Sequence, residues 1–580
     1  MSEYNQLSFT GGMNLLLDDT RLQHNQYRLA FNCRNRYDVL DPVNKSSVDT
    51  IAPSGIKQGV LTFGNYVILF VSGKAFYRAY DGKGWTQING FSMSSTAQRF
   101  WTCTVPVATT NYGRMGVARS TQYAQNASAN YGVVNVQNLV SSSGGNLPGL
   151  LVQDNETQPS FIYINASGYP IAKRTQNLAQ WNASYDKNTG NLTLDNREYV
   201  PIGNAMAFVD GILYIASQDG ASIYRSVSGR PLDFVINVNV DGSKGGDATD
   251  TAYSVGAVGI TVLRAMNDGS LFVAAQNANF MVSKNMTQNS PTIFGEYTFI
   301  RRYLFEATCV SDRAIIDSLG DTKFVDLTGV RSFNAVEQLQ NEGRNSVFTS
   351  TIASALKGIT QDIAAAILFD NYELYAINTI FGAVIAVYDT INNSWAAFDT
   401  TQTSGKKIKQ FAKIEQGVLR LFAITEDNQF YTLYDPSQSY DTASFLSLGI
   451  SANALYENNN VKLNNPKNEV KLTDFRCILN RITENSSITV QTFVNNRLSV
   501  NVPVISKDIA YKAPVNVYTG NIPDLNTQLT NAYFTFPNME QGWKVSLLIS
   551  WTGGGSLTQF STNLLDFTPM NPLLSQTTVK

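Results

Sequence analysis

The sequence predicts a mainly β protein: a degenerate β-propeller, preceded by an extended N-terminal strap and followed by a C-terminal β-sandwich-like module. Three observations lead to this prediction. A module of short apolar strands and tight turns recurs along the chain, long alternating strands follow after about residue 439, and charged residues make up only 15% of the composition. Tyr, Phe, Val and Thr favour strands, whereas the abundant Asn, Gly and Ser favour turns.

The predicted strap covers residues 1–53, and its residues 9–42 read FTGGMNLLLDDTRLQHNQYRLAFNCRNRYDVLDP. Two adjacent glycines indicate a tight turn, and three leucines at 15–17 form an apolar run. We expect these leucines and Phe31 to lie on apolar surface, and the charged side chains to contact the chain's own propeller or a neighbouring subunit. The strap residues singled out in this way are Gly11, Gly12, Asp18, Asp19, Arg21 and Arg34, with Arg28 and Arg36 as further cations.

The propeller is predicted over residues 54–438. Its recurring module is a strand, an Asp-Gly- or Asn-Gly-type turn, a second strand, a polar turn, and a strand with an aromatic residue near its end. Asp210-Gly211, between alternating strands, is the clearest hairpin signal. Such units, with three or four strands each, are typical of propeller blades. Copies lie at 59–88, 204–236, 262–283, 309–333, 366–399 and 411–435, and a weaker stretch at 149–164 begins a seventh.

Two segments depart from the module. Residues 91–147 are rich in Ser, Asn, Gly and Ala and predict a loop-rich insertion, with SSSGGN at 141–146 as a flexible tip. Residues 346–364 predict a helix, because four apolar residues there recur at steps of four, three and four along one helix face. We expect this face to pack on the propeller, with a neighbouring subunit as the alternative. The four residues are Ile352, Leu356, Ile359 and Ile363.

The C-terminal module is predicted over residues 439–580. Its segments VKLTDFRCILNRI and SSITVQTFVNNRLSVNVPV alternate apolar and polar residues over long stretches. This alternation is typical of half-buried strands in a β-sandwich or jelly roll.

Charge and cysteine usage exclude several classes of function. Lys and Arg number 43 against 45 Asp and Glu, a net charge of −2, so the chain lacks the basic footprint of tight nucleic-acid binders. No apolar run approaches the roughly 20 residues of a membrane helix and no signal peptide opens the chain, so we expect cytoplasmic assembly without membrane insertion. The cysteines lack C-x-x-C spacing, which predicts buried free thiols at Cys33, Cys103, Cys309 and Cys477.

Candidate catalytic residues are few. His24 is the only histidine, so a site with several histidine ligands cannot form within one chain, and no nucleophile motif accompanies it. We therefore expect His24 to be a surface residue.

Carboxylate pairs remain as candidates, because propeller glycosidases place an acid and a base on loops around the axis. Most of the candidate carboxylates lie in turn-like sequence, where Asp is favoured for local hydrogen bonds. The sialidase-type repeat S-x-D-x-G-x-T-W also fails at 80–87, since Lys83 replaces the glycine. We therefore expect no catalytic, cofactor-binding or metal-binding residues. The pairs considered are Asp18 with Asp19, Asp317 with Glu342, and Asp247 with Asp250.

In this order of features, the chain resembles the tail nozzle proteins of short-tailed bacteriophages, also called tail tubular protein B or the propeller tail hub. The N-terminal part of that family has a Gly-Gly after a hydrophobic residue, then a polar stretch, and then a segment that contains an asparagine. Here Gly11-Gly12, residues 18–21 and the segment LAFNCRN resemble these three parts in that order, with Asn32 as the matching asparagine. The ordered strands of 198–235, 260–283 and 306–333 resemble successive blades of that family. The resemblance covers about residues 9–435 and is one of order and texture.

This resemblance implies a structural virion protein without enzymatic activity or cofactors. The family forms a homo-oligomeric ring, commonly a hexamer, at the distal end of a short tail, where it contacts an adaptor or hub ring and tail fibres. Double-stranded DNA passes through the ring during ejection. Two alternatives stay open at this point: a propeller glycosidase or depolymerase that cleaves host surface sugars, and a carbohydrate-binding receptor protein that binds through its C-terminal module.

Overall fold

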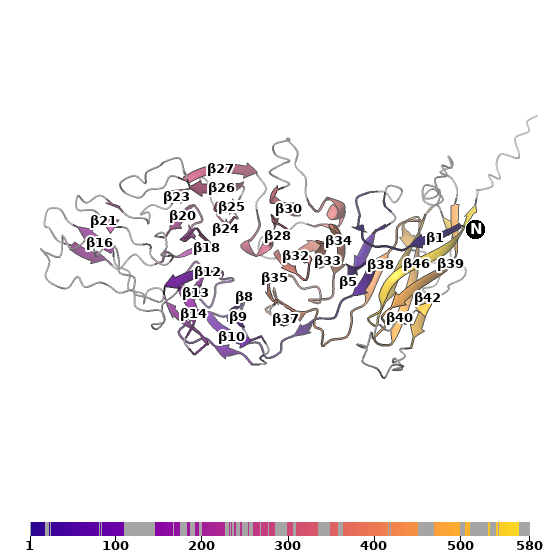
Figure 1. Ribbon diagram of the computed structural model, residues 1–580, viewed down its shortest axis with the longest axis horizontal. Helices are drawn as coiled ribbons and strands as arrows, with labels where there is room; N and C mark the ends of the chain where they lie inside the picture. Colours follow the sequence, from indigo (N-terminus) through magenta and orange to yellow (C-terminus); the bar gives the residue numbers. More distant parts are fainter. Residues whose placement is uncertain are drawn as a thin grey trace, which may run out of the picture.

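The computed structural model places strands along most of the chain (Figure 1). It describes residues 2–108, 146–226, 253–284, 299–305, 309–334, 348–357, 364–450, 469–498, 505–510, 532–533 and 541–567. Shorter gaps inside these ranges include 18–21, 24, 175–181, 186–191 and 196–199, and a few further residues are described between 231 and 245.

Seven sets of antiparallel strands follow one another along the chain and form the blades of a propeller. Six of these sets are separate sheets, and the set of blade 6 is one end of a ten-stranded sheet that continues outside the propeller. Blade 1 contains β8 (Lys57–Phe63), β9 (Tyr66–Val71), β10 (Lys74–Ala79) and β11 (Thr86–Gln87). Blade 2 contains β12 (Trp101–Ala108), β13 (Asn146–Gln153), β14 (Ser160–Ile164) and β15 (Pro170–Arg174). Blade 3 contains β18 (Gly203–Val209), β19 (Ile212–Ser217), β20 (Ser222–Arg225) and β23 (Tyr253–Ser254).

The remaining four blades complete the ring. Blade 4 contains β24 (Val262–Ala265), β25 (Leu271–Ala275), β26 (Ala278–Lys284) and β27 (Phe299–Phe305). Blade 5 contains β28 (Ile315–Ser318), β29 (Asp321–Val325) and β30 (Val330–Ser332). Blade 6 contains β31 (Ala365–Phe369), β32 (Tyr372–Thr379), β33 (Gly382–Asp389) and β34 (Ser394–Asp399). Blade 7 contains β35 (Ile408–Ile414), β36 (Arg420–Thr425), β37 (Phe430–Leu433) and β7 (Ser47–Val48).

Apolar clusters between neighbouring blades hold this ring together. Six of the seven clusters combine side chains of two successive blades, and one of these six joins blade 7 to blade 1. The seventh joins blades 5 and 6 and continues into the N-terminal and C-terminal strands outside the propeller. In the cluster between blades 7 and 1, Val60 and Leu69 of blade 1 pack with Phe422 and Phe430 of blade 7. The ring is therefore closed, and the mainly β fold with a degenerate propeller is confirmed.

The N-terminal segment closes blade 7. Strand β7 pairs antiparallel with β37, and the amide of Asp49 donates to the carbonyl of Phe430 at 2.9 Å. The Asp49 carboxylate accepts hydrogen bonds from Arg78 Nη1 at 2.6 Å and Trp85 Nε1 at 3.2 Å, both beside blade 1. The Arg78 guanidinium also lies 4.7 Å from the Trp85 ring centroid. One carboxylate thus ties the last blade to the first.

Side chains also cross the propeller axis. Arg313, in the 3₁₀ helix η3 (Asp312–Ala314) before blade 5, donates to the carbonyls of Gln58 at 2.7 Å and Phe100 at 3.1 Å, at the starts of blades 1 and 2. Arg99 reaches back to Ser311 Oγ at 3.3 Å. Blade 5 lies three or more blades from blades 1 and 2 in a ring of seven, so these contacts span the centre. Burial, then the charge of Arg99, lowers the pKa of Arg313 to about 9, while Asp312 opposes the shift.

The other unit is a β-sandwich of two sheets. One sheet contains β39 (Glu469–Asn480), β46 (Ser556–Phe567), β1 (Ser2–Gln6), β5 (Cys33–Arg36) and β6 (Val39–Pro42), with the short β43 (Ala532–Tyr533) and β44 (Gln541–Gly542). The other contains β4 (Leu29–Phe31), β38 (Ala443–Leu446), β45 (Val545–Trp551), β40 (Ser486–Val494), β41 (Arg497–Leu498) and β42 (Ile505–Ile509). Phe445 and Phe560 meet between the sheets, with ring centroids 5.7 Å apart.

The predicted boundary at residue 53 does not separate two units in space. Strands β1, β4, β5 and β6 of the N-terminal segment belong to the sandwich, and β7 belongs to the propeller. The propeller is therefore inserted between the N-terminal and C-terminal strands of the sandwich. Strand β4 joins the two units, because Phe31 pairs with Phe398 of blade 6 on one side and with Ser444 of β38 on the other.

The predicted insertion at 91–147 contains part of the propeller. Phe91 and Phe100 are buried between blades 1 and 2, and β12 pairs with β13 along its whole length. The stretch at 149–164 therefore supplies the second and third strands of blade 2. The polar composition around β12 concealed its first strand. Residues 109–145, which include the predicted tip, lie outside the described residues.

In place of the helix predicted at 346–364, the described residues 348–357 contain a 3₁₀ turn, η4 (Ser350–Ala355). Ile352 is buried as expected, but Leu356 turns to extended backbone (φ −74°, ψ 142°) and forms a β-bridge with Thr379 of blade 6. The amide of Lys357 then donates to the carbonyl of Asn378 at 3.0 Å. Pairing with blade 6 thus ends the helical turn. Ile359 and Ile363 lie outside the described residues.

Three two-stranded sheets complete the described strands: β2 (Gly12–Met13) with β3 (Gln26–Tyr27), β16 (Asn182–Tyr185) with β17 (Leu192–Asp195), and β21 (Asn237–Val238) with β22 (Lys244–Gly245). The last two lie at the end of the molecule opposite the sandwich (Figure 1).

Substitution of Asp49 should weaken the contact between blade 7 and blade 1 that closes the ring. Asp49→Asn leaves the Arg78 guanidinium, whose side chain is only 11% exposed, without its counter-ion, so we expect a loss of about 3 kcal/mol in the free energy of unfolding. The matched control is Asp317→Asn, because its partner Arg264 is 33% exposed. This variant should lose less than about 1 kcal/mol in the free energy of unfolding. Denaturant titration compares the two, and equal losses would contradict the assigned role of Asp49.

Candidate functional site

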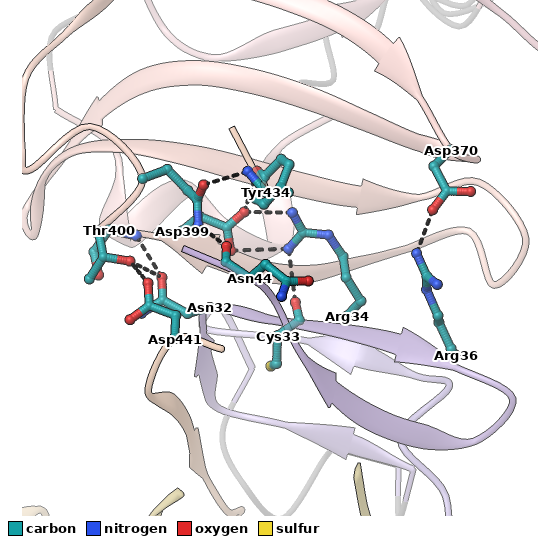
Figure 2. A network of polar contacts seen from close by, with 12 residues as sticks. Asn32, Cys33, Arg34, Arg36, Asn44, Asp370, Asp399, Thr400, Tyr434 and Asp441 are labelled. Carbon is teal, nitrogen blue, oxygen red and sulfur yellow. Dashed lines mark hydrogen bonds and ion pairs between the residues drawn. The ribbon is translucent and has the colours of Figure 1, made fainter. Parts of the chain in front are cut away.

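A buried polar network lies where the hairpin β5–β6 meets blades 6 and 7 (Figure 2). At its centre Arg34 donates two hydrogen bonds to Asp399, Nη1 to Oδ1 at 3.0 Å and Nη2 to Oδ2 at 2.6 Å. The Arg34 side chain is 7% exposed and that of Asp399 is fully buried. Nη1 also donates to the carbonyl of Cys33 at 3.0 Å. This bidentate ion pair fixes the sandwich hairpin on the end of blade 6.

Tyr434, directly after blade 7, completes the pair. Its hydroxyl donates to Asp399 Oδ2 at 2.6 Å, and the Arg34 guanidinium lies 4.7 Å from its ring centroid. Burial and then the charge of Asp399 raise the pKa of Tyr434 well above its usual value. Burial lowers the pKa of Arg34, but Asp399 outweighs it, so the net shift is upward and the guanidinium stays charged. Three elements therefore meet on one carboxylate.

Asn32 forms a second connection beside Arg34. Its backbone is left-handed (φ 53°), a conformation that asparagine tolerates. Its Oδ1 accepts from the amide of Thr400 at 3.0 Å, and its Nδ2 donates to the carbonyl of Thr442 at 3.2 Å. Thr401 in turn donates to Asp441. One amide side chain thus joins the end of blade 6 to the start of the sandwich's C-terminal strands.

The Gly11-Gly12 turn lies against the outer strand of blade 6. Gly12 has a φ of +68°, and a Cβ there would come within 2.6 Å of both Ser394 Cβ and the carbonyl oxygen of Trp395. Ser394 Oγ also donates to the carbonyl of Thr10 at 3.1 Å. Beyond the turn, the amide of Leu15 donates to the carbonyl of Thr351 at 2.7 Å. Only glycine allows this close approach of two backbones.

A cavity of about 490 Å³ opens next to the network. We call it the junction cavity, because its walls come from the hairpin β5–β6, from blades 6 and 7 and from the loops at Arg481 and Gly554 of the sandwich. Arg36 and Asp370 form an ion pair on its wall, and both side chains are partly exposed. Its volume lies in the range of small-molecule sites.

Asp41 is the unusual group of this cavity. Its Oδ1 is buried and has no hydrogen-bond partner among the described residues. Burial raises the pKa of Asp41, while a hydrogen bond from Ser556 and the charges of Arg36 and Arg481 oppose that shift. The structure therefore favours the protonated form of this carboxyl more than water does.

The predicted site residues fall into two groups. Gly11, Gly12, Asn32 and Arg34 all lie in the contact between the sandwich and blade 6. The others lie outside the described residues: Asp18, Asp19, Arg21 and His24. Arg28, a further predicted cation, donates to the carbonyl of Asn14 at 3.2 Å, within the strap itself. All contacts described for these residues are within one chain, so the inter-subunit contacts of the strap stay a prediction.

The network also contains residues that sequence reasoning missed, namely Asp399, Tyr434 and Asp441. Asp399 is the last residue of the copy predicted at 366–399, and Tyr434 follows the last strand of the copy predicted at 411–435. No local sequence motif marks a buried aspartate or tyrosine at the end of a strand. Of the carboxylate pairs, Asp317 accepts hydrogen bonds from Arg264 and Thr322. Glu342, Asp247 and Asp250 lie outside the described residues.

The four cysteines are free thiols, and three of them are buried. Burial raises the pKa of Cys309 and Cys477 to about 12, and burial with the charge of Asp399 raises that of Cys33. Cys103 is half-buried, and desolvation raises its pKa to about 12. Such thiols hold little reactive thiolate at neutral pH.

Among the described residues, no three His, Cys, Asp or Glu side chains are grouped as metal ligands. The same part of the chain contains no helix of the length and hydropathy needed to span a membrane.

Comparisons with known proteins identify no family. No family model and no curated protein matches the chain. Among solved structures, the chain is similar to the Neurospora crassa Pan2 WD40 domain, at 11% identity over 69% of this chain and 97% of that chain, with a TM-score of 0.28. It is also similar to the Dos1 propeller, at 10% identity over 68% of this chain and 96% of that chain, with a TM-score of 0.28.

A luciferin-regenerating enzyme is a further distant match, at 7% identity over 47% of this chain and 71% of that chain, with a TM-score of 0.19. Likeness at these levels indicates nothing about function. The assignment of the fold rests on the seven blades and the clusters between them.

Substitution of Asp399 should weaken the contact between sandwich and propeller. Asp399→Asn keeps the shape but leaves Arg34 as a buried charge without a counter-ion, so we expect a loss of about 3 to 5 kcal/mol in the free energy of unfolding. Asp370→Asn, which removes the partner of the 46% exposed Arg36, should cost under about 1 kcal/mol. Denaturant titration measures both losses. An Asp399→Asn variant that loses no more stability than Asp370→Asn would show that the Arg34–Asp399 pair does not hold the sandwich on the propeller.

Substitution of Asp41 should change the pH dependence of stability. Because its folded-state pKa is raised, the folded protein binds this proton more tightly than the unfolded chain, whose Asp pKa is about 3.9. Stability is therefore lost as pH rises from about 3.9 through the folded-state pKa, and it stays lost above it. Asp41→Asn resembles the protonated form, so the variant should melt above wild type at about pH 7.

The difference in melting temperature should vanish below about pH 2.5, where Asp41 is protonated in both the folded and the unfolded wild type. Calorimetry across this pH range gives the comparison. A variant that melts below wild type at neutral pH, or a difference that does not change with pH, would show that the Asp41 charge is not unfavourable in the folded protein.

Proposed function

We propose that the chain is a structural virion protein that forms the ring-shaped nozzle of a short bacteriophage tail, through which the genome is ejected. The proposal joins the resemblance described above to the architecture of the subunit. In this role the chain binds copies of itself in a ring, commonly a hexamer, and contacts an adaptor or hub ring and tail fibres. Assembly takes place in the host cytoplasm, and the chain performs no chemistry of its own.

The observation that carries the proposal is the rigid connection of the two units. The propeller is inserted into the sandwich, and the bidentate Arg34–Asp399 pair, the Asn32 contacts and the β4 strand fix one on the other. A subunit that transmits force between a tail and a cell surface must resist bending between its parts. Closed blades supply rigidity within the propeller and leave loops at both of its ends for docking.

The contacts across the propeller axis bear on the route of DNA. Arg313 and Arg99 span the centre of the propeller at the level of η3. In a nozzle, the DNA channel therefore lies between subunits on the ring axis, and not along the axis of each propeller. The net charge of −2 suits such a channel, because a strongly basic lumen would bind phosphates and slow the passage of DNA.

Electron microscopy of the purified protein, alone and mixed with its adaptor, tests the proposal. We expect rings with one central hole on the symmetry axis and propellers without open centres around it. A monodisperse monomer that cleaves polysaccharide would refute the nozzle and favour the depolymerase. A monomer that binds polysaccharide without cleaving it would favour the receptor protein.

The strap can be tested in the same assay without removing sandwich strands. Deletion of residues 1–45 would remove β1 and β4–β6 and unfold the sandwich, so a point variant is preferable. Leu16 is 59% exposed on the strap, and Leu16→Asp should stop ring assembly with little change in melting temperature. Leu498→Asp, at a leucine 53% exposed on β41, controls for an added surface charge. Normal rings with Leu16→Asp would exclude the strap from the subunit interface.

A further inference from the structure

The first strand of each blade faces the propeller axis, and Arg313 lies among these strands. Strand β35 contacts β8 and β31, and β18 contacts β12 and β24, so the first strands form the inner wall of the ring. The turn η3 contacts β24, β31 and β35, which belong to blades 4, 6 and 7. Arg313 Nη2 donates to carbonyls at the starts of blades 1 and 2. The guanidinium is therefore held at the centre of the propeller.

Two guanidinium groups share one carboxylate at this place. Arg99 forms an ion pair with Asp312. Arg313 forms no ion pair within the described residues, and the two acceptors of its Nη2 are neutral carbonyls. Burial and the charge of Arg99 lower the pKa of Arg313 to about 9, and the opposing charge of Asp312 does not cancel this shift. One positive charge thus lacks a counter-ion in the described part of the chain, which is costly for a cation removed from water.

Arg313 and Gln410 each have N–H donors that are open to solvent. Arg313 is half-buried, and its Nε and Nη1 neither hold a hydrogen bond within the described residues nor belong to the sealed atoms there. Gln410, on β35, accepts from the amide of Val60 at 3.2 Å through Oε1, and its Nε2 is a donor in the same situation. Gln410 Oε1 and Arg313 Nη2 lie 3.4 Å and 3.6 Å from the position that a Cβ of Gly59 would take. The two side chains are therefore neighbours, beside a residue that has no side chain.

The contacts of Arg313 favour a spherical anion over a planar one. Arginine binds carboxylates and phosphates through two parallel N–H donors, and every such pair of a guanidinium includes Nη2. In Arg313 this nitrogen already donates to the carbonyls of Gln58 and Phe100. The donors that remain, on Nε and Nη1, point in different directions and can each reach a single atom.

We propose that the propeller axis binds one chloride ion, held by the remaining donors of Arg313 and by Nε2 of Gln410. The single negative charge of the ion matches the single guanidinium that lacks a counter-ion. A sphere accepts N–H donors from any direction, so it does not need the parallel pair that Nη2 would complete. The ion would connect η3 to blade 7, in addition to the hydrogen bonds that connect η3 to blades 1 and 2.

Other occupants fit this place less well. Water would satisfy the donors but would leave the charge of Arg313 unmatched. Formate matches the charge but finds no parallel pair of donors. A doubly charged phosphate or sulfate would bring a surplus negative charge toward Asp312, next to Arg313 in the chain. This site adds a ligand to the chain and does not depend on the nozzle proposal.

Chloride NMR of the full chain tests the inference, with the ionic strength held constant by sodium gluconate. We expect the protein to broaden the chloride signal, and sodium bromide to reverse this broadening at concentrations about tenfold lower than sodium formate does. Arg313→Gln should weaken chloride binding about tenfold or more, the usual effect of losing a charge-assisted hydrogen bond. Arg264→Gln, at an arginine that already has Asp317 as its counter-ion, should bind chloride as wild type does.

A second variant, Gln410→Glu, keeps the test decisive if Arg313→Gln does not fold. It retains an acceptor for the amide of Val60 and places a carboxylate beside Arg313, so it should lose chloride binding without a lower melting temperature. The inference is overturned if bromide reverses no broadening in wild type, or if a folded Arg313→Gln or Gln410→Glu binds chloride as tightly as wild type. Displacement by formate as effective as that by bromide would also overturn it, because it would indicate a carboxylate site.

Discussion

The ion pair between Arg34 and Asp399 is the contact on which the arrangement of the two units depends. Both side chains are removed from water, so each is tolerable only in the presence of the other. Tyr434 and the carbonyl of Cys33 use further hydrogen-bonding positions of the pair. Because the three elements share one carboxylate, the sandwich hairpin cannot shift against blades 6 and 7 without exposing a buried charge. The junction cavity lies beside this fixed point and takes its shape from it.

The same N-terminal segment serves both units. Within residues 2–49 it adds strands to both sandwich sheets, crosses to blade 6 through Phe31 and Asn32, and then closes the propeller through β7 and Asp49. Here one stretch of chain sets the closure of the ring and the position of the sandwich together, so a change in either is transmitted to the other through covalent structure.

Sequence reasoning located the elements better than their spatial partners. The Asp-Gly-type turns and alternating strands located six of the seven blades and part of the second, because hairpin signals are local. Strand β12 was missed because its neighbours are polar, and the helix at 346–364 was wrong because Leu356 pairs with Thr379, a tertiary contact that periodicity does not contain. Gly12, Asn32 and Arg34 were found, but their partners Ser394, Thr400 and Asp399 lie more than 350 positions away in the chain.

The insertion of the propeller into the sandwich also orders events during synthesis on the ribosome. Strand β1 pairs with β46, Ser2 opposite Leu564, and β4 pairs with β38. These N-terminal strands emerge first but have no sandwich partners until residues 443–567 have been translated. The blades can pair locally in the meantime, since each hairpin is contiguous in sequence. The earliest part of the chain is thus the last to be paired, and its exposed strand edges must be kept from aggregating while the propeller forms.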